Sequence, residues 1–181
     1  MVAVFPLGET PIGKIFRISA RVFTVIALLG LLDAISPIGI SYNHSKSLPR
    51  GFYWHRPVEL PLHRGQLVCF RYVAPESVKT RHYFPEGTLI CKSVLGLPGD
   101  HIVRSGLETK ICIANSCVSA GTSLTHDSQG RPLPALEFPD VVPAGSLFLS
   151  STRVPNSFDS RYLGLIAQSA LVRETHPFLT E

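Results

Sequence analysis

The feature that most constrains this chain is a single long apolar run, which extends from roughly Val22 to Ile40. A helix needs roughly 20 apolar residues to cross a bilayer, and this run approaches that length. Asp33 and Pro37 interrupt it, so only Val22 to Leu32 is free of charged residues and proline. The run predicts either a retained membrane anchor or a cleaved signal peptide. We favour the anchor, because no A-x-A cleavage site closes the run.

Basic residues just before the run set its expected orientation. Lys14, Arg17 and Arg21 precede it, with Glu9 as their only acidic neighbour. Cytoplasmic flanks carry an excess of Lys and Arg, so we expect residues 1–21 to be cytoplasmic, 22–40 to be the anchor and 41–181 to be an extracytoplasmic domain. This flank supplies half of the net charge of +4, and the other basic residues are scattered singly. We therefore expect no nucleic-acid binding.

Beyond Ser41 the sequence predicts a mainly β fold. Runs rich in β-branched and aromatic residues predict strands, and Gly and Pro separate these runs. The predicted strands are Gln66–Val73, Thr88–Val94, His101–Val103, Lys110–Ile113 and Ser146–Ser150. We expect a loop-rich insertion from about Ser119 to Phe138, and nothing in the composition indicates a second domain after residue 41.

The cysteines lead to two further expectations. Cys112 and Cys117 are separated by a short segment that suits a hairpin closed by a disulfide in an oxidising compartment. A zinc site would need a second close pair of ligands, which the sequence lacks, so we expect neither a metal nor another cofactor. Cys69 and Cys91 lie in apolar strand-like runs, and we expect both to be buried free thiols.

A turn-rich stretch, Asn43–Trp54, follows the apolar run. Pro49 fixes its own φ and Gly51 allows a turn, so Ser47 is expected on a constrained, non-helical loop that can present its hydroxyl to an extended partner. Serine-rich loops after apolar segments are usually plain linkers. A chemical role for Ser47 therefore depends on a second residue.

Lys92 is the residue that can supply this role. It lies in Leu89–Gly96, the most apolar stretch after the expected anchor. A lysine there either reaches solvent from an edge strand or is buried, and burial would lower the pKa of its amine. A neutral amine can accept the proton of a serine hydroxyl, so Ser47 and Lys92 are candidates for a Ser-Lys dyad. The histidines show no triad pattern with Asp and Ser.

Three sequence boxes, in the order of one enzyme family, connect these residues. Lys92–Asp100 resembles the K-x-x-x-G-x-P-G-D box of type I signal peptidases, and Val142–Leu149 followed by Ser157–Gly164 resembles their last box. Ser45–Tyr53 is most similar to the S-x-S-x-P-x-G-x-Y form of the TraF branch, the conjugative-transfer peptidases of that superfamily. The resemblance implies a signal-peptidase-like β domain preceded by one N-terminal transmembrane helix.

Two departures from the housekeeping signal peptidases point towards the TraF branch. Pro49 follows Ser47 by two residues, whereas the housekeeping enzymes carry S-M-x-P. The segment Ser150–Arg153 stands where those enzymes carry G-D-N-R.

The resemblance implies that Ser47 is the nucleophile and Lys92 the general base. Ser45 matches a position whose hydroxyl lines the oxyanion hole, beside the backbone N–H of Ser47. This assignment fits the chemistry, because a developing oxyanion needs donors that are already in place.

The last box implies supporting residues. Ser157 matches the serine that orients the lysine, and Asp159 and Arg161 match an ion pair that supports the site. From the residues alone, Asp159 to Arg161 could equally form an Asx turn with a surface salt bridge.

Taken together, the sequence predicts a membrane-anchored serine endopeptidase whose protein substrate is the pilin precursor of a conjugation apparatus, with or without pilin cyclisation. The alternative is a general type I signal peptidase that acts on exported preproteins. A third reading, from another class, is a non-catalytic assembly factor of the conjugation channel, a type IV secretion system. The expected location is a bacterial inner membrane, crossed once, with the catalytic domain on the periplasmic side.

Overall fold

The computed structural model describes residues 11–35, 38–154 and 156–181. The chain forms two compact units, Met1–Gly39 and Ile40–Glu181. The predicted cytoplasmic segment, residues 1–21, lies in part outside the described residues.

The described part of the first unit forms the helix α1 (Pro11–Ile35). Between residues 15 and 28 many of its side chains are apolar and exposed, namely Ile15, Phe16, Ile18, Val22, Phe23, Val25, Ile26 and Leu28. No helix in the described part of the chain combines the length and the hydropathy that a membrane span requires. Gly39 and Ile40, the last two residues of the predicted span, lie in a strand rather than in the helix.

The second unit is mainly β, as predicted. Its larger sheet has the strand order β1-β2-β10-β3-β4-β8-β9, and the pairs from β2 to β9 are antiparallel. These strands are β1 (Gly39–Asn43), β2 (Gly51–Arg56), β3 (Leu67–Arg71), β4 (Leu89–Gly96), β8 (Ser146–Ser150), β9 (Ile166–Ala167) and β10 (Leu171–Thr180). The last strand of the sequence therefore lies between β2 and β3, and connects the first two strands to the rest of the sheet.

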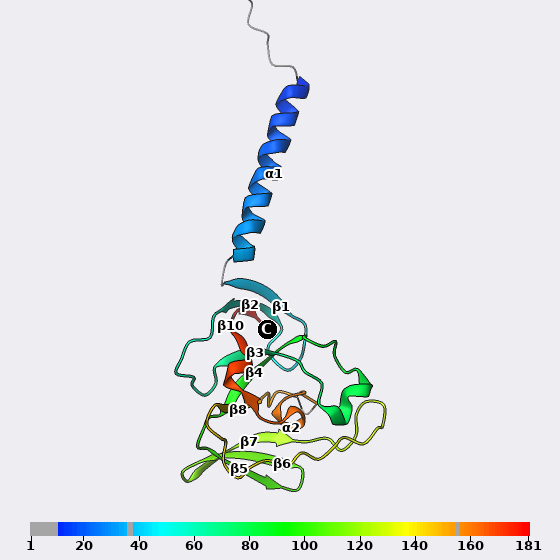
Figure 1. The fold of residues 1–181 in the computed structure, drawn as a ribbon, viewed down its shortest axis with the longest axis vertical. Helices are drawn as coiled ribbons and strands as arrows, with labels where there is room; N and C mark the ends of the chain where they lie inside the picture. The colour runs from blue at the N-terminus through cyan, green and yellow to red at the C-terminus, as the bar shows by residue number, and fades with distance from the viewer. Residues whose placement is uncertain (1–10, 36–37, 155) are drawn as a thin grey trace, which may run out of the picture. The chain divides into compact units, whose positions relative to one another are not determined.

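A smaller antiparallel sheet consists of β5 (His101–Ser105), β6 (Glu108–Ile113) and β7 (Ser116–Thr122). Within this unit, Figure 1 shows these three strands at the opposite end from β1 and β2. The helical elements of the unit are short: η1 (Glu76–Arg81), α2 (Ser160–Leu163) and η2 (Gln168–Ala170). The expected loop-rich insertion begins inside β7, and only the isolated bridge between His126 and Pro132 interrupts the irregular stretch that follows.

Strand β4 lies in the main core and determines where Lys92 sits. Its residues alternate strictly between half-buried and buried, and Ile90, Lys92 and Val94 all point to the buried side. Ile90 and Val94 pack in a cluster with five other side chains, Val68, Phe70, Tyr72, Leu147 and Leu149. Because the side-chain period of a strand is two, the lysine between Ile90 and Val94 has to share their buried face.

Two disulfides are present. One joins Cys112 to Cys117, which are directly opposite each other on β6 and β7. The other joins Cys69 to Cys91, so the expectation that these two are free thiols was wrong. They are directly opposite on β3 and β4, with Cα atoms 4.0 Å apart. The two apolar runs predicted strands but not their pairing, and the pairing is what brings the sulfur atoms together.

Candidate active site

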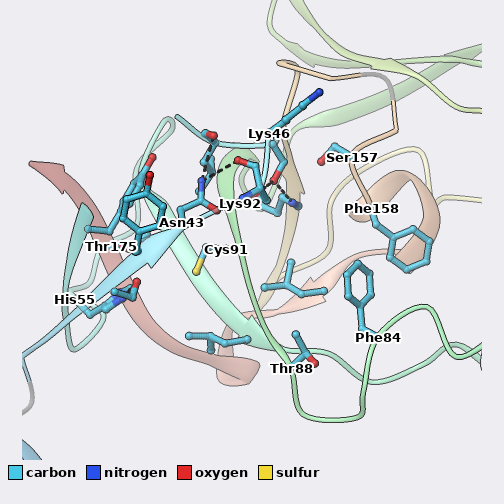
Figure 2. A pocket seen from close by; sticks show the side chains of 18 of the residues that line it. Asn43, Lys46, His55, Phe84, Thr88, Cys91, Lys92, Ser157, Phe158 and Thr175 are labelled. Carbon is cyan, nitrogen blue, oxygen red and sulfur yellow. Dashed lines mark hydrogen bonds between the residues drawn. The ribbon is translucent and has the colours of Figure 1, made fainter. Parts of the chain in front are cut away.

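A cleft of about 630 Å³ opens in the second unit and contains both Ser47 and Lys92. Its walls come from β1, from the loop between β1 and β2, from the start of β4, from the segment before α2, and from β10. Figure 2 shows Cys91 and Lys92 near the middle, with His55 and Thr175 on one side and Phe84 and Phe158 on the other.

Asn43, at the end of β1, holds the serine loop in shape. Its Oδ1 atom accepts hydrogen bonds from the backbone N–H of Ser45 at 3.0 Å and from the Ser45 hydroxyl at 2.8 Å. Its Nδ2 group donates to the carbonyl oxygens of Leu48 at 3.2 Å and Pro49 at 2.9 Å. One asparagine side chain therefore bonds several backbone N–H and C=O groups of a loop that has no neighbouring strand to bond them.

Two hydroxyl groups from outside the loop fix it further. The Tyr53 hydroxyl donates to the carbonyl oxygen of Pro49 at 2.7 Å. The Ser151 hydroxyl, from just beyond β8, donates to the carbonyl oxygen of Ser47. These bonds fix the backbone on both sides of Leu48, and Ser47 is buried and lines the cleft.

Lys92 approaches Ser47 from strand β4. Its Nζ atom donates to the Ser47 Oγ atom over 3.0 Å. The residue is only 5% exposed. This burial is the largest influence on its amine and lowers the pKa to about 8, against the opposing effect of the Asp159 carboxylate. An amine with such a pKa is partly neutral near physiological pH, and a neutral amine at this distance can accept the serine proton.

The Ser45 hydroxyl lies beside the Ser47 hydroxyl. The two Oγ atoms are 3.1 Å apart. Its bond to Asn43 fixes the Ser45 hydroxyl, so this group is held beside the Ser47 oxygen. The neighbourhood of Ser45 and Ser47 was expected from the sequence, and the structure places both at the cleft wall.

Ser157 is buried and lines the cleft together with Lys92. Its hydroxyl has no hydrogen-bond partner among the described residues, so the expected bond to Lys92 is not formed here. A buried hydroxyl without a partner is costly, and a small rotation or a bound substrate would relieve that cost.

Asp159 and Arg161 form an ion pair that is almost entirely buried, with side-chain exposures of 0% and 1%. The guanidinium donates from Nε and Nη2 to the two carboxylate oxygens, each over 2.9 Å. The same guanidinium donates to the carbonyl oxygen of Ser157 at 3.2 Å, and Asp159 accepts from the backbone N–H of Ser151 at 3.1 Å. Asp159 also accepts from the backbone N–H of Arg161 at 3.2 Å, so the Asx-type turn does form, but its salt bridge is buried rather than on the surface. This bidentate pair connects the segments that carry Ser151 and Ser157.

Sequence reasoning missed two residues that shape this site, Asn43 and Ser151. An asparagine two residues before Ser45 is a typical Asx-turn signal, and this signal was available in the sequence. Ser151 carried no such signal, because its contact depends on how β8 approaches the serine loop. Within the described residues, no group of three or more His, Cys, Asp or Glu side chains is arranged to hold a metal ion.

Comparisons with known proteins relate this geometry to a family. The family model described as signal peptidase, peptidase S26, matches residues 15–179. A conjugal transfer protein TraF from Agrobacterium fabrum is 32% identical over 186 residues, which cover 96% of this chain and 98% of that protein. A plasmid transfer protein TraF from Escherichia coli is 27% identical over 167 residues, covering 85% and 90%.

Among solved structures, a signal peptidase I from Enterococcus faecalis aligns with 61% of this chain and 92% of its own, at 20% identity and a TM-score of 0.35. The family model spans nearly the whole chain, and the Agrobacterium relative is similar from end to end. The chain therefore belongs to the peptidase S26 family of signal peptidases, as a TraF-type member.

Proposed function

We propose that this protein is a serine endopeptidase with a Ser47–Lys92 dyad that processes the pilin precursor of a conjugation apparatus. The observation that carries the proposal is the 3.0 Å contact between the Lys92 amine and the Ser47 hydroxyl, at a buried point in an open cleft. A lysine in the core without a catalytic or ionic partner would be costly, whereas here its amine faces a hydroxyl.

In the proposed mechanism the neutral amine of Lys92 takes the proton of Ser47 as the serine oxygen attacks the scissile carbonyl. The oxyanion that develops is stabilised by the backbone N–H of Ser47 and by the hydroxyl of Ser45, which exchanges its bond to Asn43 Oδ1 for one to the oxyanion. Collapse of this intermediate gives an acyl-enzyme at Ser47, and the lysine returns its proton to the leaving amine. Water then releases a linear product, while the amino terminus of the same chain would release a cyclic one.

Within the proposal, Asp159, Arg161 and Ser157 are positioning residues. The ion pair fixes the carbonyl group of Ser157 and the backbone of Ser151, and Ser151 in turn fixes the loop that carries the nucleophile. The unpartnered hydroxyl of Ser157 lines the cleft together with Lys92, which supports its assignment as the group that orients the amine during the reaction.

The proposed substrate follows from the relatives, whose names refer to conjugal and plasmid transfer. The proposed location is a bacterial inner membrane, with α1 as the attachment and the Ile40–Glu181 unit in the periplasm. The exposed apolar side chains of α1 between residues 15 and 28 support this attachment.

The test is the intact mass of a candidate pilin from cells that carry the wild-type protein, Ser47→Ala, or the control Ser105→Ala. Ser105 is an exposed serine at the end of β5, in the smaller sheet. We expect the mature pilin with the wild type and the control, and only the precursor with Ser47→Ala. A cyclic pilin would be lighter than its linear form by one water.

Other outcomes would point to the alternatives. Accumulation of many exported preproteins in the Ser47→Ala strain would favour a general signal peptidase. Normal pilus formation with Ser47→Ala would contradict a peptidase role and favour the assembly factor.

A further inference from the structure

The cleft has an excess of positive charge that the dyad does not explain. Besides Lys92, its lining includes the cationic side chains of Lys46 and Arg173, and within the described part of the chain it includes no Asp or Glu. A concave surface lined by one sign of charge concentrates its field and attracts ligands of the opposite sign. An extended peptide with an acidic group is therefore better suited to this cleft than a basic one.

Arg173, on β10, lacks the partner that comparable arginines have. Each of the other buried or half-buried arginines in the described residues donates to a carboxylate or a carbonyl oxygen: Arg56 to Glu174, Arg81 to Pro132, Arg104 to Leu136, Arg131 to Asp127 and Arg161 to Asp159. Arg173 is half-buried and forms no such bond within that part of the chain. Its guanidinium is always charged and presents a planar fork of donors that matches a carboxylate.

Polar residues from three neighbouring strands line the same part of the cleft. His55 on β2 is directly opposite Thr175 on β10, and its Nε2 atom lies 2.7 Å from the Ser41 hydroxyl on β1. Its Nδ1 atom is buried and has no hydrogen-bond partner among the described residues. Burial, and secondly the Arg173 charge, lower the pKa of His55, so its ring is neutral. Of Ser41, His55, Arg173 and Thr175, which we call the Arg173 corner, only Arg173 is charged.

This corner is connected to the strand that carries Lys92. Arg173 is opposite Cys69 on β3, and Cys69 is disulfide-bonded to Cys91, the residue before Lys92. In Figure 2, His55 and Thr175 lie on the side of Cys91 that is away from Phe84 and Phe158. A peptide whose scissile carbonyl lies at Ser47 therefore has a polar, cationic wall on one side and an aromatic wall on the other.

We propose that Ser41, His55, Arg173 and Thr175 form a carboxylate subsite that selects peptides with an acidic group close to the scissile bond. The acidic group is an Asp or Glu side chain or a C-terminal carboxylate, since the guanidinium fork recognises both in the same way. The subsite deepens the proposed peptidase function and rests on it for its biological meaning. Its binding chemistry, however, can be measured without catalysis.

The experiment uses the full-length protein in detergent, with Ser47→Ala to keep the peptides intact. The probes are fluorescent short peptides rich in Ala, Gly and Ser, in which one Asp is moved along an amidated chain. Each peptide has an Asn counterpart, and a further peptide without Asp carries a free C-terminal carboxylate. Fluorescence anisotropy gives the dissociation constants for three backgrounds, namely Arg173 intact, Arg173→Gln and Arg173→Lys.

We expect at least one carboxylate peptide to bind about tenfold more tightly than its neutral counterpart, the difference typical of one charge-assisted interaction. The Asp series and the free C-terminus distinguish the two sources of the carboxylate. Arg173→Gln should remove the preference, and Arg173→Lys should keep part of it. The control Arg71→Gln, at an exposed arginine of β3 that does not line the cleft, should leave the preference unchanged.

Equal binding of every acidic and neutral pair would overturn the subsite, as would an undiminished preference in Arg173→Gln. Thermal unfolding of each variant shows whether a loss reflects the side chain or the fold. Cleavage of the same peptides by the wild type is a separate readout. If nothing is cleaved, the proposed peptidase function fails, while the binding result still decides the subsite.

Discussion

At the scale of single residues, the chemistry of Lys92 depends on three influences of different sign. Burial lowers the pKa of its amine most, the Asp159 carboxylate raises it, and the Arg161 guanidinium lowers it. Because Asp159 and Arg161 are paired with each other, their charges act on Lys92 in opposite directions. The low pKa of Lys92 therefore follows mainly from its place between Ile90 and Val94 on the buried face of β4.

The first prediction concerns the pH dependence of cleavage. The base has to be neutral, and with a pKa of about 8 only about a tenth of Lys92 is neutral at pH 7. The value of kcat/KM should therefore rise with pH and level off above about 8. A profile on a fluorogenic peptide tests this, and a midpoint near the ordinary lysine value of 10.5 would contradict the buried base.

The second prediction concerns Lys92→Arg, which keeps the charge but cannot supply a neutral base. We expect cleavage to fall to the level of Ser47→Ala, and the double variant to be no worse than either single one, because the two residues act as a unit. Single-turnover cleavage of the pilin precursor by purified protein measures this. Near wild-type cleavage by Lys92→Arg would rule out the dyad and direct attention to other bases, such as His44 and His101.

At the scale of elements, the loop between β1 and β2 is held mainly by one side chain, which gives the third prediction. Asn43→Ala removes the acceptor of the Ser45 bonds and the donor to Leu48 and Pro49. We expect kcat to fall about 10²-fold, because a displacement of the nucleophile by about 1 Å costs that much. The control Asn115→Ala, at an exposed turn residue after β6, should leave kcat unchanged. An equal loss in both variants would contradict a specific role of Asn43.

The fourth prediction compares the two disulfides. Cys69 and Cys91 are 22 residues apart and Cys112 and Cys117 are 5 apart. The chain-entropy estimate for these loops gives about 3 kcal/mol for the first and about 2 kcal/mol for the second. Replacing each pair by alanine and measuring urea unfolding should show the larger loss of unfolding free energy for Cys69 and Cys91. The opposite order would contradict the expectation.

Three of the seven strands of the main sheet could be predicted from the sequence, but not the other four or the strand order. Runs of β-branched and aromatic residues predicted β3, β4 and β8 close to their observed bounds. Strand β10 was missed, because its sequence contains Arg173, Glu174 and Pro177, which are uncommon in an inner strand. Its charged residues are tolerated because Glu174 is satisfied by neighbours such as Arg56 and Gln66, which only the folded sheet brings together.

In the site, too, local sequence indicated the key residues but not the contacts that depend on strand order. The spacing of the boxes singled out Ser47 and Lys92, and the structure places them 3.0 Å apart. The sequence did not indicate the disulfide beside Lys92, the contact from Ser151 or the group of polar residues around Arg173. These depend on which strands are neighbours, and strand order is a property of the tertiary fold rather than of local sequence.

At the scale of the whole molecule, the two units have different surfaces. The Ile40–Glu181 unit packs its apolar side chains into its own core, whereas α1 exposes apolar side chains such as Phe16, Phe23 and Ile26. Exposed apolar surface of this kind marks an interaction with a membrane or with another protein. The exposed apolar side chains of α1 therefore support its proposed attachment to the inner membrane.

The fifth prediction tests this attachment and its orientation. The basic residues Lys14, Arg17 and Arg21 should keep the N-terminus in the cytoplasm and leave the Ile40–Glu181 unit outside. The protein should stay with the membrane fraction after alkaline carbonate extraction, and protease added to spheroplasts should digest the part after Ser41.

Because the orientation depends on the charge of this flank, reversing all three residues to glutamate should reduce the digested fraction, while reversing Arg50, Arg71 and Arg104 should not. Release of the wild-type protein by carbonate would contradict the attachment, and complete protection of the part after Ser41 would contradict the orientation.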